Sequence, residues 1–155
     1  MIRTASLAAI AAASLAAPAF ADGHVEASGD AAAGEGEFRQ CQSCHVVESP
    51  DGEVLAGRNA RTGPNLYGIA GRTAGVIEDF RYSDIMVLAG EQGMVWDEAN
   101  FVPYLQDPTG HLQEVTGDGG RGKMSYRVRD ETDAVNLYAY LAQFGTPEEI
   151  VGEGS

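Results

Sequence analysis

The stretch Cys41-Gln42-Ser43-Cys44-His45 decides how this chain folds and what it binds. Two cysteines three positions apart on a helical turn point to one side, and the histidine follows directly after them. Thiols placed in this way can add to the two vinyl groups of a haem, and the adjacent imidazole then reaches the iron. The motif predicts one covalently attached haem c, held by Cys41 and Cys44, with His45 as an axial ligand.

Other uses of the two cysteines fit the sequence less well. A disulfide is the default for an exported protein with an even number of cysteines, but the spacing favours a cofactor. A thioredoxin-like dithiol would need a strand before Cys41, and no strand-like run precedes it. A zinc site would need four ligands, and beyond the motif only the scattered His24 and His111 offer nitrogen.

The first residues, MIRTASLAAIAAASLAAPAFA, predict a secretory signal peptide over residues 1–21. They begin with the cation Arg3 and continue through an apolar run that ends in the small residues Ala19 and Ala21. That run is shorter than the roughly 20 residues that a membrane-spanning helix needs. We therefore expect cleavage after Ala21, a periplasmic location and no stable membrane insertion.

The length and composition of the remaining residues 22–155 predict one globular domain. The chain of 155 residues has a formal net charge of −13, which argues against a nucleic-acid partner. We expect a monomer. The last residues, about 146–155, predict a flexible acidic tail.

Helical patterns lie near both ends of the chain. Asp30 can cap a helix running toward Cys41, in which Gly34 and Gly36 indicate either poor helicity or a close crossing by another helix. The clearest pattern carries apolar residues at i, i+3, i+4 and i+7. It predicts a helix capped by Asp130 or Thr132 and stopped at Gly145 and Pro147.

The middle of the chain is expected to be ordered loop with short helices. Glycine and proline are frequent from residue 46 to residue 82, and a short helix is expected over residues 84–89. Asp97 can cap a helix that ends at Pro108 and is kinked or 3₁₀-like near Pro103. Because no convincing run of alternating apolar residues occurs, the predicted fold class is all-α.

Several motifs follow one another in a fixed order. They are CQSCH, TGPNLYGIAGRTAG over residues 62–75, Trp96, Asp107-Pro108, and GKMSY over residues 122–126. In this order and spacing they resemble the class I cytochromes c, of the bacterial cytochrome c2 type. The similarity covers nearly the whole chain after the signal peptide, and it implies helices and ordered loops wrapped around one haem c.

The second iron ligand cannot be chosen from the residues alone. Met86 lies on a short apolar helix and is expected in the core, whereas Met94 and Met124 both lie in loops. The resemblance selects Met124, opposite His45. A thioether favours reduced iron and raises its potential, which suits an electron carrier.

The resemblance assigns roles to further residues. It implies that the Pro64 carbonyl accepts the free N–H of His45, and that Gly34 lies where the first and last helices cross. It places Arg72, Tyr82 and Trp96 around the haem propionates and Tyr104 near the methionine side, although each could also be an ordinary core aromatic or surface arginine.

The implied function is electron transfer without catalysis. The donor would be a membrane quinol:cytochrome c oxidoreductase, and the acceptor a photosynthetic reaction centre or a terminal oxidase. The alternative is a haem c enzyme or sensor, peroxidase-like or gas-binding, which requires an open iron position.

One departure from the resemblance concerns the docking charges. Family members commonly surround the exposed haem edge with lysines, whereas Lys123 is the only lysine here. Arginines could replace them on an otherwise acidic body. The arginines in segments that the family places near that edge are Arg58, Arg61, Arg121, Arg127 and Arg129.

Overall fold

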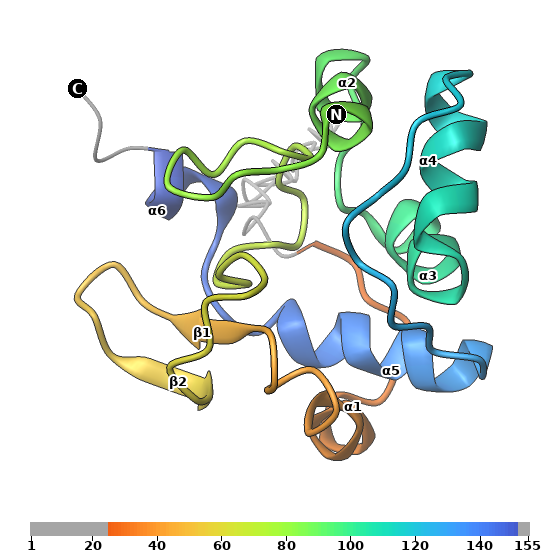
Figure 1. The fold of residues 1–155 in the computed structure, drawn as a ribbon. Coiled ribbons are helices and arrows are strands. Elements are labelled where there is room, and N and C mark those ends of the chain that lie inside the picture. Colours follow the sequence, from red (N-terminus) through yellow and green to blue (C-terminus); the bar gives the residue numbers. More distant parts are fainter. Residues whose placement is uncertain (1–24, 152–155) are drawn as a thin grey trace, which may run out of the picture.

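A computed structural model describes residues 25–151, so the predicted signal peptide lies outside the described residues. The elements are α1 (Ala31–Phe38), β1 (Val46–Glu48), β2 (Val54–Gly57), α2 (Asp84–Glu91), α3 (Glu98–Gln106), α4 (Pro108–Thr116), α5 (Glu131–Leu141) and α6 (Pro147–Val151). Figure 1 shows α1 crossing α5, with the hairpin on one side and α3 and α4 on the other. The predicted helical fold is confirmed. Within the described part, no helix is long and apolar enough to cross a membrane.

The crossing of α1 and α5 explains the glycine at position 34. A Cβ added to Gly34 would lie 2.0 Å from the Asn136 carbonyl oxygen, whereas one added to Gly36 would meet nothing within 4 Å. Asp30 caps α1 by accepting hydrogen bonds from two backbone amides of its first turn. The Asp30 amide in turn donates to Asn136 Oδ1 at 2.8 Å, which fixes the start of α1 against α5. Of the two explanations that the sequence left open, the structure supports a close helix crossing for Gly34 but not for Gly36.

Helix α5 contributes its apolar face to the hydrophobic core. Its predicted apolar face is confirmed, with Leu137 and Tyr138 buried. The Tyr138 hydroxyl donates to the Trp96 carbonyl at 3.1 Å, so the aromatic core is also tied to the loop before α3. Asp130 caps the helix through the amides of Thr132 and Asp133, which settles the choice between the two candidate caps.

The hairpin of β1 and β2 is a correction to the sequence analysis, which expected loop there. Val46 pairs with Gly57 and Val47 with Ala56, and the register is irregular after Val47. Both valines are fully buried, so β1 lacks the alternation of apolar and polar residues that marks a half-exposed strand. Ser49 closes the turn, because its amide donates to the Glu53 carbonyl at 2.9 Å.

Proline has two different roles in α3 and α4. Helix α3 begins at its cap Asp97 and continues as an α-helix through Pro103, so the expected 3₁₀-like stretch is absent from this helix. Pro108 does more than end α3, because it is the first residue of α4, where a missing N–H costs nothing. Asp107 caps α4 by accepting from the Gly110 amide.

His111 joins α4 to α3 from a buried position. Its Nε2 donates to Asn100 Oδ1 at 3.2 Å, because the Asn100 amide nitrogen already donates to the Val95 carbonyl and to Asp97. Its Nδ1 is buried and has no hydrogen-bond partner among the described residues. Burial lowers the pKa of His111, so the ring is neutral at pH 7.

The first residues of the predicted acidic tail, about 146–155, include a short helix. Residues 147–151 form α6, and the preceding Gly145 has a φ of +71°. Glu149 accepts hydrogen bonds from the Tyr67 hydroxyl at 2.8 Å and from the Thr146 amide at 2.9 Å. The last four residues of the predicted tail, 152–155, lie outside the described range.

The two helical glycines of α1 provide a matched test of the crossing. Gly34→Ala should lower the free energy of unfolding by about 1–3 kcal/mol, because the new methyl group would force α1 away from α5. Gly36→Ala should instead stabilise the protein by about 0.5–1 kcal/mol through helix propensity. Urea unfolding of the holoprotein measures both. Equal effects of the two substitutions would contradict the close crossing.

Candidate functional site

The Cys41–His45 segment continues the helical turns of α1. The Cys41 amide donates to the Phe38 carbonyl at 2.9 Å, and the His45 amide donates to the Cys41 carbonyl at 2.9 Å. Both cysteines are free and partly buried. The segment is preceded by a helix, whereas a thioredoxin-like dithiol follows a strand. The predicted attachment residues Cys41 and Cys44 thus lie on helical turns that continue α1.

The environment of Cys41 does not activate a thiolate. Burial, together with the neighbouring Cys44 and Glu37, raises the pKa of the Cys41 thiol to about 11. A redox-active cysteine needs a lowered pKa instead. For the zinc alternative, residues 25–151 contain no group of three or more His, Cys, Asp or Glu side chains that could hold a metal ion.

The imidazole of His45 is oriented by one strong contact. Its Nδ1 lies 2.9 Å from the Pro64 carbonyl oxygen, and because a carbonyl only accepts, Nδ1 carries the proton. Burial lowers the pKa of His45, which keeps the ring neutral. Nε2 then presents a lone pair, as a metal-binding histidine requires. The residues present therefore fit a haem iron at Nε2.

Gly63 is a site residue that the sequence analysis did not identify. A Cβ at this position would lie 2.4 Å from His45 Cε1, so only glycine lets the 62–65 turn pass beside the ring. The backbone reinforces this approach, because the Gly63 amide donates to the Cys44 carbonyl at 2.7 Å. The available sequence signal was the glycine-proline turn itself, which reads as an ordinary loop.

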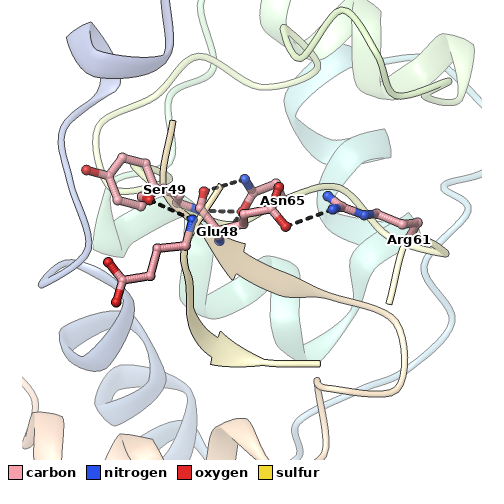
Figure 2. A network of polar contacts seen from close by, with 6 residues as sticks. Glu48, Ser49, Arg61 and Asn65 are labelled. Carbon is pink, nitrogen blue, oxygen red and sulfur yellow. Dashed lines mark hydrogen bonds and ion pairs between the residues drawn. The ribbon is translucent and has the colours of Figure 1, made fainter. Parts of the chain in front are cut away.

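Asn65 is a second residue that the sequence analysis missed. Its Oδ1 accepts from the amides of Glu48 and Tyr67 at 3.0 and 3.1 Å, and its Nδ2 donates to the Glu48 carbonyl at 2.7 Å. Figure 2 shows this network, which extends to Arg61 through its ion pair with Glu48. The side chain of Asn65 thus holds the loop containing Pro64 against β1.

Arg72 is buried without a carboxylate partner within the described part of the chain. It is only 3 % exposed, and its guanidinium donates to the Tyr67 carbonyl at 2.6 Å and the Asn65 carbonyl at 3.2 Å. Both described ion pairs involve other arginines. Burial lowers the pKa of Arg72, so keeping this guanidinium charged in the interior reduces the free energy of unfolding. A buried cation of this kind suits the carboxylates of haem propionates.

Three predicted aromatic residues gather beside Arg72. Trp96 and Tyr104 pack edge to face with ring centroids 4.8 Å apart, and the Trp96 amide donates to the Arg72 carbonyl at 2.8 Å. Burial raises the pKa of both Tyr82 and Tyr104. The charge of Arg72 partly offsets the effect of burial on the pKa of Tyr82. Trp96 therefore joins the ring of Tyr104 to the backbone of Arg72.

Burial separates the three described methionines. Met86 and Met94 are 6 % and 4 % exposed and belong to the hydrophobic core, which confirms the expectation for Met86. Met124 lies in the segment between α4 and α5 and is only partly buried. Like Cys41 and Tyr82, it packs against the margin of the hydrophobic core. Among these three, Met124 is the one that is not buried.

Comparison with known proteins gives consistent matches, although no family model matches the sequence. The chain is 60% identical to the cytochrome c2 of Rhodovulum adriaticum over 126 residues, which cover 81% of this chain and 100% of that protein. It is 53% identical to a cytochrome c2 of Cereibacter sphaeroides over 117 residues, covering 74% of this chain and 94% of the relative.

Solved structures agree with these relatives. A crystal structure of cytochrome c2 from Rhodobacter sphaeroides superposes with a TM-score of 0.75 at 51% identity, covering 77% of this chain and 98% of that one. The structure of ferric cytochrome c-550 from Paracoccus versutus gives a TM-score of 0.70 at 40% identity, covering 76% and 98%.

Gly63→Ala tests the close approach of the turn to His45. The added methyl group should tilt the ring and break its bond to the Pro64 carbonyl, lowering the free energy of unfolding by about 1–3 kcal/mol. It should also weaken the low-spin haem spectrum of the purified protein, because imidazole orientation controls ligation. Gly119→Ala is the control, since a Cβ there meets nothing within 4 Å. An unchanged spectrum for Gly63→Ala would refute this geometry.

Proposed function

Because the chain belongs to the class I cytochromes c of the cytochrome c2 type, which carry one covalently attached haem c, we propose that it shuttles single electrons in the periplasm. It acts as a carrier and not as an enzyme. The observation that carries this proposal is the hydrogen bond from His45 Nδ1 to the Pro64 carbonyl, which leaves Nε2 available for iron. The proposed donor is a membrane quinol:cytochrome c oxidoreductase, and the proposed acceptor is a photosynthetic reaction centre or a terminal oxidase.

In this proposal the chain holds the cofactor by four side chains. Cys41 and Cys44 would form the thioether bonds, and His45 and Met124 would hold the iron. When bound, the haem supplies a reversible one-electron couple between ferrous and ferric iron. The bond to Pro64 would hold the imidazole in one orientation, and the thioether of Met124 would favour the reduced state.

The surrounding residues adjust the charge of the site. The guanidinium of Arg72 is buried, so it can offset propionate carboxylates that would otherwise be desolvated without a partner. Tyr82 and Trp96 are proposed to add donors and apolar cover beside the propionates, and Tyr104, which packs against Trp96, is proposed to close the methionine side. Together they exclude water, which strengthens each electrostatic contact within the site.

Docking to the redox partners is proposed to use unpaired arginines. Arg61 is bound to Glu48 and Arg127 to Asp107, each at 2.7 Å, so these two contribute less to the local field. Arg58, Arg121 and Arg129 are exposed and form no ion pair within residues 25–151. The proposed face therefore rests on these three arginines with Lys123. Binding there should be brief, since redox encounters bury less than about 1,200 Å².

Replacement of Met124 tests the proposed ligation. Met124→Leu should abolish the near-infrared sulfur-to-iron charge-transfer band and lower the midpoint potential markedly within the ~0.8 V range that axial ligands span. Met86→Leu and Met94→Leu are matched controls, because both methionines are buried in the core. Potentiometric titration of the holoproteins measures the potentials. A wild-type protein with a low potential and no such band would favour the alternative, a haem enzyme or sensor with an open iron position.

Ionic strength tests the docking face. The rate of electron transfer to an acidic protein partner should fall as salt rises, over the range where the Debye length shrinks to about 8 Å. The control is a small uncharged oxidant, whose rate should stay constant. Stopped-flow kinetics measures both reactions. A protein-partner rate that does not change with salt would rule out electrostatic docking by these arginines.

A further inference from the structure

The segment that carries Met124 has no regular structure. It runs from the end of α4 to the start of α5, alongside α3 and α4 (Figure 1). Its backbone therefore lacks a ladder of hydrogen bonds, and a few separate contacts hold it in place. How firmly Met124 is held depends on those contacts.

Most of these contacts lie on one side of the site. Gln113 of α4 donates to the Gly120 carbonyl at 2.9 Å, and the Val128 amide donates to the Leu105 carbonyl of α3 at 2.9 Å. The Arg127–Asp107 ion pair lies between α3 and α4, and Lys123 donates to the Arg81 carbonyl before α2. All four tie the segment to the chain between residues 81 and 113.

One contact reaches the other side. The Tyr126 hydroxyl donates to Gln40 Oε1, across 86 positions of sequence. Tyr126 stands two residues after Met124, and Gln40 directly precedes Cys41. The amide nitrogen of Gln40 donates to Glu37 of α1 at 3.2 Å, so the acceptor is itself held in place. Among the side-chain hydrogen bonds of residues 25–151, this one joins the segment that carries Met124 to the segment that carries the attachment cysteines.

We propose that Tyr126 and Gln40 form a clasp that positions Met124 for iron ligation. The inference rests on the proposed function, in which Met124 is an iron ligand. Both partners are exposed, and Tyr126 is 42 % exposed, so core packing does not account for the placement of its ring. The hydroxyl contributes instead by keeping the Met124 segment close to the Cys41 segment.

The clasp controls how easily Met124 is replaced. An external ligand such as imidazole can reach ferric iron only after the thioether leaves, and its apparent affinity scales with the population in which the segment has opened. A hydrogen bond between exposed groups changes such an equilibrium by roughly 3- to 10-fold. Loss of the clasp should therefore raise the apparent affinity for imidazole by about that factor.

The test is a double-mutant cycle on the ferric holoprotein, titrated with imidazole and followed by haem absorbance. Tyr126→Phe and Gln40→Leu should each raise the affinity about 3- to 10-fold, and the double variant should exceed neither by more than about 2-fold, since both remove one contact. Tyr140→Phe is the control, because its hydroxyl has no hydrogen-bond partner among the described residues. The near-infrared sulfur-to-iron band should persist in every variant before imidazole is added.

Two outcomes would overturn the clasp. Unchanged affinity in both single variants would show that the contact does not restrain Met124, and additive increases would show that the two side chains act separately. Failure of the proposed function looks different. A wild-type holoprotein without the sulfur-to-iron band would show that Met124 is not a ligand, which removes the role of the clasp as well.

Discussion

The hydrogen bond from His45 Nδ1 to the Pro64 carbonyl is the contact on which the rest of the site depends. It fixes the tautomer of the ring and aims Nε2 away from the backbone. Gly63 makes the approach possible because it has no Cβ, and Asn65 holds the same turn against β1. The Asn65 carbonyl then accepts from Arg72, so one short turn orients the proposed ligand and also the buried cation.

The helices provide the frame in which this turn is held, and the loops provide the chemistry. Helix α1 leads directly into the cysteine motif, and its position against α5 is set by the contact at Gly34. Helices α3 and α4 enclose the far side, where the buried His111 joins them. Because short helices are marginally stable alone, their packing against α5 and around the site must supply most of their stability.

The sequence predicted features whose cause is local, and it failed where the cause lies elsewhere in the fold. The cysteine motif and the cap Asp30 depend on neighbouring residues, so both could be read directly. A glycine in a helix has two explanations, and only the position of α5 separates them for Gly34. Asn65 looks like a turn residue until β1 is placed beside it. Met124 could be selected only by resemblance, because burial in the core cannot be read from the neighbours of a methionine.

The two sides of the proposed haem site are held with unequal firmness. On the histidine side, Asn65 alone forms three side-chain hydrogen bonds and its carbonyl accepts a fourth, all partly buried. On the methionine side, isolated contacts, three of which are exposed, hold a segment without regular structure. Exposed contacts open more easily than buried ones, because water can replace the lost partner at little cost. Ligand exchange should therefore begin at Met124, while His45 stays in place and keeps the site assembled.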